Sequence, residues 1–373
     1  MAAADAVALR TEELMLNMGP QHPSTHGVLR LLVTLDGENI VDVQPDIGYL
    51  HSSVEKMMEY RTYVQNVALT DRGMDYLIAL NNEEAYCLAV ETLAGIEVPE
   101  RARYIRVIFN ELNRIASHLV WLGTWGIDLG ATTVFLYCFR EREMILDLFE
   151  KVTGGRLHHV YYRVGGVYAD LPEGWVQAAT GFLDYFLPRV DEYHALLTAN
   201  PIFLARTRGV GVMSRKNAIA MGASGPVGRA SGIAQDVRKV TPYEVYARFD
   251  FNVPVETAGD CYSRYVVRME EMRQSVRIIR QALRGLPGGE IRTRVPMTMK
   301  APRGEVYVRT ESPRGDLGMF LVSDGGETPY RLKIRGPSFT NLYALTEMMK
   351  GWKIADVIAI LGSIDIVLSD VDR

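Results

Sequence analysis

A loop rich in glycine, proline and histidine near the N-terminus constrains this chain more than any other feature. Residues 19–27 read Gly-Pro-Gln-His-Pro-Ser-Thr-His-Gly, with an apolar-rich run on each side, at 13–17 and at 28–35. Proline does not fit inside a helix and pushes the preceding residue towards an extended backbone, and the glycines at both ends permit sharp turns. The flanking runs are typical of strands. The pattern therefore predicts a long hairpin whose tip carries two of the seven histidines in the chain.

The two loop histidines, His22 and His26, are open to two interpretations. Imidazole is the side chain whose pKa lies nearest to neutral pH, so the loop is suited to proton exchange. A rigid proline–glycine turn with solvated histidines explains the same residues, because loops carry function but also vary freely. The loop by itself leaves both interpretations open.

The composition excludes several classes of protein. At 373 residues, the chain has enough material for a large core and for about two or three structural units. Its formal net charge of -4 argues against a general nucleic-acid binder, which normally carries a basic excess. The three cysteines lie far apart without a Cys-x-x-Cys pair, so neither a disulfide framework nor a thiolate metal site is indicated. This cysteine usage suits a reducing compartment.

No part of the sequence is predicted to cross a membrane. The N-terminus carries an acidic residue and lacks the basic start and long apolar core of a signal peptide. The best candidate span, 116–135, is interrupted by His118 and Asp128, and the apolar stretch 354–368 is interrupted by two aspartates. A spanning helix needs about 20 mostly apolar residues, and central charges are costly. We therefore expect a chain that can lie against a membrane but does not cross it by itself.

Changes in hydrophobic periodicity divide the chain into three regions. Residues 12–52 alternate strand-like runs with turns. Residues 53–290 follow a helical period, with helices expected at 75–94, 102–122, 132–151, 175–200 and 260–283. Residues 291–373 return to strand-like runs, at 305–308, 319–322 and 330–334, and end in two helical pieces. The predicted fold class is α+β, with an N-terminal antiparallel β-region, a central helical bundle and a C-terminal β-rich region with helices.

The expected helix at 102–122 carries polar side chains along one stripe. Glu111, Arg114 and His118 are spaced at i, i+3 and i+7, beside an apolar surface. Farther along, Asp128 lies among apolar and small residues, where a carboxylate needs a partner. It could cap the next helix, which is the commoner role of an aspartate before a helical run, or hold an imidazole in orientation. The sequence leaves both roles open.

Other polar groups give weaker signals. Tyr76, at an expected helix start, can donate a hydrogen bond or a proton, although tyrosine is abundant here (19 copies). His158 and His159 are adjacent, so their side chains diverge, and no metal site is expected there. The glycine-rich run 222–232 lacks the Gly-Lys-Ser/Thr ending of a phosphate loop and is better explained as a structural crossover. The residues alone indicate a site for proton-coupled chemistry whose cofactor comes from elsewhere.

Longer motifs extend over nearly the whole chain and resemble one family. They begin with the loop at 19–27 and continue at 47–51, 74–76, 110–119, 128–131, 140–143, 163–167, 229–232, 236–239, 304–307, 322–326 and 370–373. Jointly they resemble the 49-kDa, or D-type, subunit of proton-pumping NADH:quinone oxidoreductase, respiratory complex I. That family is similar to the large subunit of nickel–iron hydrogenases, whose two Cys-x-x-Cys pairs are missing from this sequence. The resemblance therefore implies a pocket without a metal ion.

The resemblance also implies roles for particular residues. In the family the pocket receives the head group of a quinone, and the matching positions make His26 and Tyr76 its hydrogen-bond partners. Asp128 pairs with His26 in this interpretation. His158 and Arg72 match positions near the terminal iron–sulfur cluster, which belongs to the adjacent small subunit. A tyrosine and a carboxylate-supported histidine would supply protons, and the partner's cluster would supply electrons, so this chain is expected to bind no cofactor of its own.

The implied function is that of one subunit in a membrane-attached enzyme. We expect a proton-translocating NADH:quinone oxidoreductase that is active only when assembled and is peripheral on the cytoplasmic side of the cell membrane. Expected partners are the small iron–sulfur subunit, other peripheral-arm subunits and membrane-arm subunits. Two alternatives are a non-catalytic scaffold that docks the iron–sulfur subunit to the membrane arm, and the equivalent subunit of a ferredoxin- or deazaflavin-linked quinone reductase. The sequence identifies neither the quinone nor the electron donor.

The chain departs from the family pattern in three places. Arg72 stands one residue farther from the Met-Asp-Tyr motif at 74–76 than expected. Ser52 replaces an arginine that some members carry. The stretch 292–301 is short and is expected to lack a helix that normally precedes the Gly-Glu-Val-Tyr motif at 304–307. These differences concern contacts with partners and leave the expected quinone residues intact.

Overall fold

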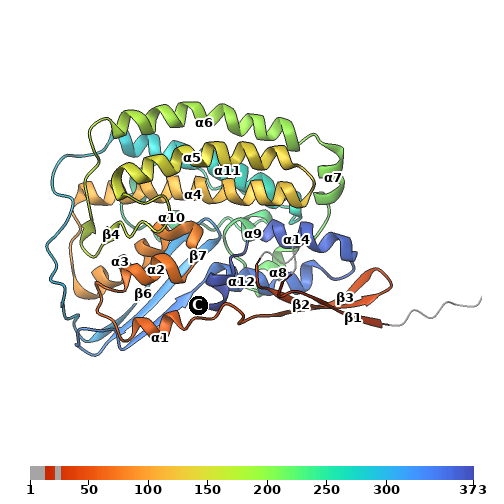
Figure 1. Ribbon diagram of the computed structural model, residues 1–373, viewed down its shortest axis with the longest axis horizontal. Coiled ribbons are helices and arrows are strands. Elements are labelled where there is room, and N and C mark those ends of the chain that lie inside the picture. The colour runs from red at the N-terminus through yellow and green to blue at the C-terminus, as the bar shows by residue number, and fades with distance from the viewer. Residues whose placement is uncertain (1–12, 22–26) are drawn as a thin grey trace, which may run out of the picture.

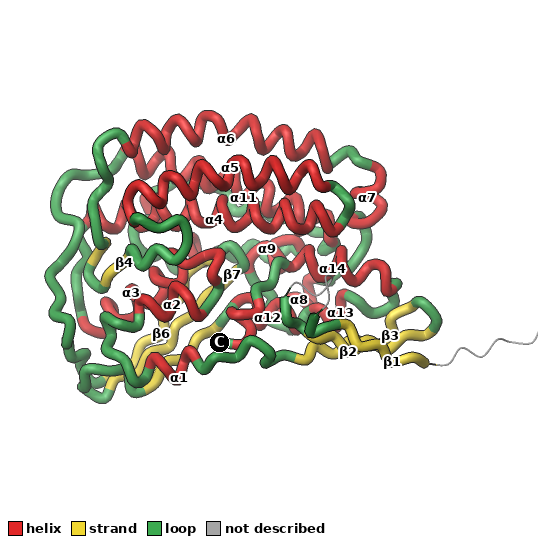
Figure 2. The backbone as a smooth tube through the Cα atoms, in the orientation of Figure 1, coloured by secondary structure: helices red, strands yellow, loops and turns green. Residues whose placement is uncertain are grey.

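The computed structural model describes residues 13–21 and 27–373. A layer of long helices forms one side of the molecule, and two antiparallel three-stranded sheets lie on the other side (Figure 1). Figure 2 shows the same division, with the longer strands in the lower part of the view. Strands come first along the chain, long helices follow, and strands with short helices end it. This order confirms the predicted α+β class.

The N-terminal sheet is the predicted hairpin with one further strand. β1 (Glu13–Met18), β2 (Arg30–Asp36) and β3 (Asn39–Asp46) pair antiparallel in the order β1-β2-β3. Met18 pairs with Leu31, so the histidine loop begins where the β1–β2 ladder ends. Alternate residues of β2 are buried, as expected for a sheet with one face on the core.

The helical region begins with two short helices, α1 (Val54–Met58) and α2 (Val67–Gly73), and its five long helices are α3 (Ala79–Ala94), α4 (Glu100–Asp128), α5 (Thr132–Thr153), α6 (Trp175–Leu197) and α11 (Cys261–Arg284). The helices predicted at 132–151, 175–200 and 260–283 are confirmed to within a few residues as α5, α6 and α11. α4 packs extensively against α5 and α11, so it is the central helix of the bundle.

α4 is longer than predicted. It continues past residue 122 to Asp128, through two glycines that locally disfavour a helix. A Cβ at Gly123 would lie 3.3 Å from the Cα of Phe135, so the glycine lets α5 approach closely. Trp125 is buried and donates its Nε1–H to the carbonyl of Ala359 at 3.1 Å. Tertiary packing therefore stabilises turns of the helix that the local sequence does not favour.

The helix predicted at 75–94 begins later than expected. Asp75 is the N-cap of a 3-10 turn, η2 (Tyr76–Ile78), and α3 starts directly after it. The Asp75 carboxylate accepts a hydrogen bond from the backbone N–H of Leu77 at 3.0 Å, a local bond that competes with α-helix formation. Tyr76 therefore lies on a tight turn between two helices.

The C-terminal region contains the second sheet and several short helices. β6 (Gly304–Ser312), β7 (Gly315–Ser323) and β8 (Arg331–Arg335) pair antiparallel in that order, which confirms all three predicted strands. Four short α-helices and a 3-10 turn follow, where two helical pieces were expected. The smaller elements of the chain are β4 (Tyr162–Arg163), β5 (Gly166–Val167), α7 (Pro201–Thr207), α8 (Arg215–Ala220), α9 (Gly225–Ala230), α10 (Val237–Val240), η3 (Tyr246–Arg248), α12 (Pro337–Tyr343), α13 (Leu345–Met348), η4 (Ile354–Asp356), α14 (Val357–Ile364) and α15 (Leu368–Asp372).

The C-terminal residues connect distant parts of the chain. The Asp372 carboxylate accepts hydrogen bonds from the backbone N–H groups of Gly48 at 2.9 Å and Leu50 at 2.7 Å. The Ser369 hydroxyl donates to the carbonyl of Met74 at 2.5 Å. α15 therefore fixes both the loop after the N-terminal sheet and the segment that leads into η2.

Buried apolar side chains from the three predicted regions form one continuous cluster. The division into 12–52, 53–290 and 291–373 therefore stays a prediction from sequence periodicity. In the described part of the chain, every helix is too short or too polar to span a bilayer.

Candidate functional site

Tyr76 occupies the first position of η2, with 42% of its surface exposed. Two amides hold this turn: Asn82 donates to the carbonyl of Asp75 at 2.8 Å, and Asn113 donates to the carbonyl of Leu77 at 2.9 Å. These amides come from α3 and α4, so two long helices position the tyrosine. Partial burial and the neighbouring Asp75 raise the pKa of Tyr76. The phenol therefore holds its proton at neutral pH and is available as a donor.

A buried ion pair lies beneath the Tyr76 turn. Asp75 Oδ2 lies 2.7 Å from Arg314 Nη1, and both side chains are buried. Arg314 comes from the turn between β6 and β7; it also donates to the Ser117 hydroxyl at 3.0 Å and lies 3.3 Å from Asp365 Oδ1. Burial, together with Asp370 and Asp365, raises the pKa of Asp75 to about 7 against the lowering effect of Arg314. Asp75 therefore changes charge near neutral pH.

Asp128 lies far along α4 from this turn. It is the last residue of the helix and is partly buried. Asn113, which contacts η2, is four turns earlier, so the helical rise separates the two backbones by about 22 Å along the axis. The N-cap position of α5 is Ala131, so the capping role considered for Asp128 is wrong. The structure does not bring Tyr76 and Asp128 into direct contact. The predicted partner His26, like His22, lies outside the described residues.

His158 lies in the segment that follows α5, with a left-handed backbone (φ 59°). Its Nδ1 lies 3.6 Å from Asp71 Oδ2, and 34% of its side chain is exposed. Asp71 interacts with Glu83, and burial raises the pKa of both carboxyls. His159 instead is buried, with Nδ1 3.1 Å from the carbonyl of Gly155, and burial lowers its pKa to about 4. The two adjacent histidines therefore have separate surroundings.

Arg72 is exposed in the last turn of α2, directly after the buried Asp71. Gly73 follows it and accounts for the changed spacing to the Met-Asp-Tyr motif. A Cβ at Gly73 would lie 2.6 Å from Cγ2 of Val54, a buried residue of α1. The close contact between α1 and α2 therefore requires glycine here. The position of Arg72 and His158 beside a partner's cluster stays a prediction.

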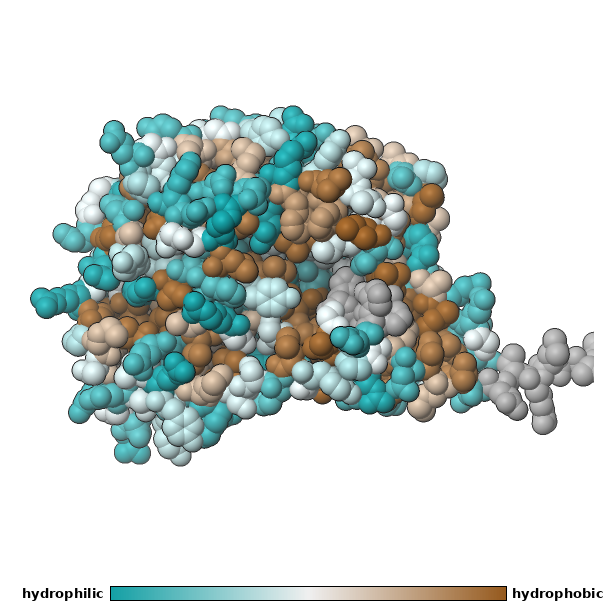
Figure 3. Space-filling view, in the orientation of Figure 1, coloured by the Kyte–Doolittle hydropathy of each residue, from teal (hydrophilic) through white to brown (hydrophobic). Residues whose placement is uncertain are grey.

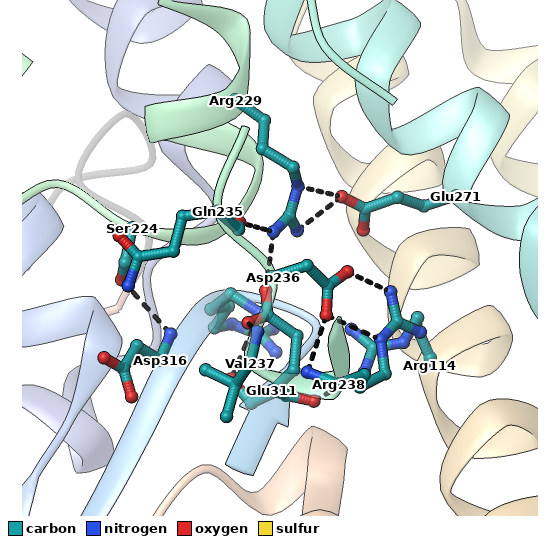
Figure 4. Close-up of polar contacts among 12 residues, drawn as sticks. Arg114, Ser224, Arg229, Gln235, Asp236, Val237, Arg238, Glu271, Glu311 and Asp316 are labelled. Atoms are coloured by element: carbon teal, nitrogen blue, oxygen red, sulfur yellow. Dashed lines mark hydrogen bonds and ion pairs between the residues drawn. The ribbon is translucent and has the colours of Figure 1, made fainter. Parts of the chain in front are cut away.

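The polar stripe on α4 belongs to a buried charge cluster that the sequence pattern does not predict. Arg229 of α9 points toward Glu271 of α11 (Figure 4). The two side chains form an ion pair with 2.6 Å between their charged atoms. Arg229 also lies 2.7 Å from Glu311 of β6. His118 lies 2.9 Å from the other oxygen of Glu271, and burial lowers the pKa of this histidine despite the carboxylate. His118 is therefore fully buried and does not contact solvent.

A second arginine completes this cluster. Arg238 of α10 lies 3.0 Å from Glu111 and 2.6 Å from Asp236, and Glu111 also lies 3.3 Å from Arg114. Burial raises the pKa of Glu111, but Arg238 and Arg114 lower it more, so this carboxyl is ionised. The local signal for these contacts is that Arg229 and Arg238 lie within the motifs at 229–232 and 236–239. Their partners come from distant elements, which the sequence pattern does not reveal.

The glycine-rich run at 222–232 is confirmed as a structural crossover. A Cβ at Gly225 would lie 2.5 Å from the carbonyl oxygen of Arg314, so the run packs directly on the β6–β7 turn. The cavity beside it measures about 10 Å³ and is lined by residues that include Ser224, Arg229 and Asp316. This space is about that of one water molecule, too small for a phosphate.

Comparison with known proteins gives the family. A family model described as the 49 Kd subunit of respiratory-chain NADH dehydrogenase matches residues 128–300 and 293–373. The D-type subunit of the NADH-quinone oxidoreductase of Dehalococcoides mccartyi is 55% identical over 368 residues, covering 98% of this chain and 100% of that protein. The corresponding protein of Desulforamulus reducens is 53% identical over 366 residues, with the same coverage. The chain belongs to this 49-kDa subunit family.

One relative in the 49-kDa family carries residues that this chain lacks. The H-type subunit of the NAD(P)H-quinone oxidoreductase of Thermosynechococcus vestitus is 52% identical over 392 aligned positions, covering 98% of this chain and 99% of that protein. These positions outnumber the 373 residues of this chain, so the relative carries extra residues. The two matched pieces of the family model overlap at 293–300. Residues 285–303 are all described and contain no helix, which agrees with the short stretch noted at 292–301.

The described residues, 13–21 and 27–373, form no metal-binding cluster. Within these ranges, no group of three or more histidine, cysteine, aspartate or glutamate side chains is arranged to hold a metal ion. Cys87, Cys138 and Cys261 are each buried and free.

Proposed function

We propose that this chain and a small iron–sulfur subunit together form the site where an NADH:quinone oxidoreductase delivers electrons and protons to quinone, coupled to proton translocation. The names of its relatives, NADH-quinone and NAD(P)H-quinone oxidoreductase subunits, supply the reaction class. Identity of 55% over 98% of the chain supports the same reaction here.

The observation that carries the proposal is the Tyr76 turn above the buried Asp75–Arg314 pair. Reduction of a quinone to a quinol takes two electrons and two protons. A partly exposed phenol held by two helices can donate one proton. The buried positive charge of Arg314 stabilises the negative charge that the phenol acquires, because electrostatic interactions are strong away from water.

In this proposal the second proton comes from His26, supported by Asp128. Tyr76 lies on η2, which contacts α4 at Asn113, and Asp128 ends α4 about 22 Å farther along the helix axis. A quinone head group at Tyr76 therefore does not touch Asp128 directly. Asp128 therefore acts through the histidine, by orienting the imidazole and favouring its charged form.

The iron–sulfur cluster of the partner subunit would supply the electrons. Two residues expected near that cluster flank one buried carboxylate: His158 lies 3.6 Å from Asp71, and Arg72 follows Asp71 in the chain. Both are at least partly exposed. Their proximity supports one docking face for the iron–sulfur subunit.

Exposed apolar surface at the N-terminal sheet supports an interface with other subunits, which in this proposal are membrane-arm subunits on the cytoplasmic side. Leu14 and Met15 are 59% and 67% exposed on β1, and hydrophobic side chains gather around this sheet in Figure 3. An apolar groove of about 320 Å³ lies between β3 and α12, lined by Val43, Gln44, Pro45, Ile47, Phe339, Leu342, Tyr343 and Thr346. Exposed apolar surface of this kind is typical of an interface.

The test is Tyr76→Phe in the assembled complex, with Tyr330→Phe as the control because Tyr330 is also exposed, at 67%. Loss of a proton donor should lower quinone turnover by about a hundredfold. Oxidation of NADH by ferricyanide, which bypasses the quinone, should stay near the wild-type rate. Wild-type quinone turnover in Tyr76→Phe would overturn the proposal.

The two alternatives predict different outcomes. A scaffold predicts that Tyr76→Phe lowers quinone turnover only in proportion to lost assembly. A ferredoxin- or deazaflavin-linked enzyme predicts that the assembled complex reduces quinone with those donors and not with NADH. Activity with each donor, divided by the amount of assembled complex, separates the three cases.

A further inference from the structure

Three carboxyl groups surround one buried guanidinium beneath Tyr76. Arg314 lies 2.7 Å from Asp75 and 3.3 Å from Asp365. Asp370 of α15 adds a third carboxyl, which accepts a hydrogen bond from the backbone N–H of Ser338 at 2.8 Å. Asp75, Arg314 and Asp370 have at most 1% of their surface exposed. Water therefore contributes little to screening these charges.

Asp75 faces one guanidinium, that of Arg314, and two further carboxyls, those of Asp370 and Asp365, so the charges around it do not balance when all three carboxyls are ionised. The buried Arg268 of α11 interacts with Asp365 and Arg314. Arg314 is the central cation, and Arg373, which donates to the carbonyl of Asp370 at 2.8 Å, is another at the edge. A buried carboxylate without a full counter-charge favours its protonated form. Asp75 is the member that takes the proton near neutral pH, because burial raises its pKa to about 7 with help from Asp370 and Asp365.

Asp75 and Arg314 act on Tyr76 in opposite directions. Beyond the effect of burial, the Asp75 carboxylate raises the pKa of Tyr76 and the Arg314 guanidinium lowers it. When Asp75 is neutral, the positive charge of Arg314 is no longer offset. The phenol is then more acidic, and the negative charge left after proton donation is better stabilised.

We propose that Asp75 is a positioning residue for Tyr76: it holds the first turn of η2 on Arg314, and its protonation state sets how readily the phenol gives up its proton. This inference rests on the proposed function. In the step concerned, the quinone accepts electrons from the partner's iron–sulfur cluster. The Tyr76 O–H bond breaks, an O–H bond forms on a quinone oxygen, and the remaining phenolate later regains a proton from water.

The experiment measures quinone turnover by the assembled complex from about pH 5.5 to about pH 8.5, with a short-chain quinone as the probe. Wild type should show a step near pH 7, with higher turnover on the acid side. Asp75→Asn is neutral throughout and should lose this step, staying near the acid-side rate. Asp365→Asn removes one negative charge near Arg314, so Asp75 ionises more readily and the step should move to lower pH.

The control is Asp260→Asn, because Asp260 caps α11 by accepting from Ser263 N–H at 2.7 Å and asparagine caps helices equally well. This variant should keep the wild-type step. A step unchanged in both Asp75→Asn and Asp365→Asn would overturn the inference. If Asp75→Asn fails to assemble, the shift in Asp365→Asn decides the result alone.

Tyr76→Phe, measured in parallel, separates the two proposals. If Tyr76→Phe reduces quinone at the wild-type rate, the proposed function fails. If Tyr76→Phe loses quinone turnover while Asp75→Asn keeps the pH step, only the inference about Asp75 fails. A purely structural role for Asp75 predicts a lower rate at every pH with the step unchanged.

Discussion

The carboxylate of Asp75 lies 2.7 Å from the guanidinium of Arg314, and both side chains are buried. One residue precedes η2, and the other comes from the turn between β6 and β7. This pair joins the helical bundle to the C-terminal sheet directly beneath Tyr76. The position and acidity of that tyrosine therefore depend on a contact between two regions far apart in sequence.

The stability of the chain should depend on Asp75 in a defined pH range. The pKa of Asp75 is about 7 in the folded chain and about 3.9 when unfolded, so only the folded chain holds this proton between those values. The free energy of unfolding therefore falls as pH rises from about 4 to about 7. The difference in unfolding free energy between wild type and Asp75→Asn should change by about 4 kcal/mol across this range. Denaturant unfolding at several pH values measures it; a constant difference contradicts the prediction.

Glu271→Gln should destabilise the chain strongly, because Glu271 pairs with buried Arg229 and His118. Removing one partner of a buried ion pair costs about 3–5 kcal/mol. Asp191→Asn is the matched control: Asp191 lies 2.5 Å from Arg273 but is 75% exposed, and such pairs contribute about 0–1 kcal/mol. Denaturant midpoints compare the stability of the two variants. Equal losses of stability would show that the buried cluster contributes no more than an exposed ion pair.

Gly73→Ala should disturb the turn that carries Tyr76. The new Cβ would lie 2.6 Å from Cγ2 of buried Val54, and overpacking of this kind costs about 1–3 kcal/mol. Val54→Ala removes the clashing atoms, so the double variant should lose less stability than the sum of the single changes. A double-mutant cycle on thermal unfolding measures this coupling. Additive losses of stability would mean that the contact with Val54 does not require glycine at residue 73.

The proposed pairing of His26 with Asp128 should appear as non-additive kinetics. If Asp128 acts only through His26, Asp128→Asn should lower quinone turnover in wild type but have no further effect in His26→Ala. Turnover of the four assembled complexes, normalised to NADH oxidation by ferricyanide, completes the cycle. If the two substitutions lower quinone turnover independently, so that their effects multiply, Asp128 does not act through His26.

The candidate site was predicted only in part, for identifiable reasons. Tyr76 and His158 were named from motifs, and the structure places each beside a buried carboxyl, Asp75 and Asp71. The capping role for Asp128 was wrong because α4 continues to that residue through packing of Trp125 on Ala359. The positions of His26 and the partner's cluster are not tested by the described residues.

The N-terminal hairpin, the long helices and the C-terminal strands follow from the local sequence, because hydrophobic periodicity and turn residues act between near neighbours. The sequence motifs also determined the family. The pairing of buried charges, such as Arg314 with Asp75 or Arg229 with Glu271, depends instead on the folded arrangement of the whole chain. A buried charge needs a counter-charge within a few ångströms, and the chain can supply it from any distance along its length. A local sequence pattern therefore does not predict which buried charges pair.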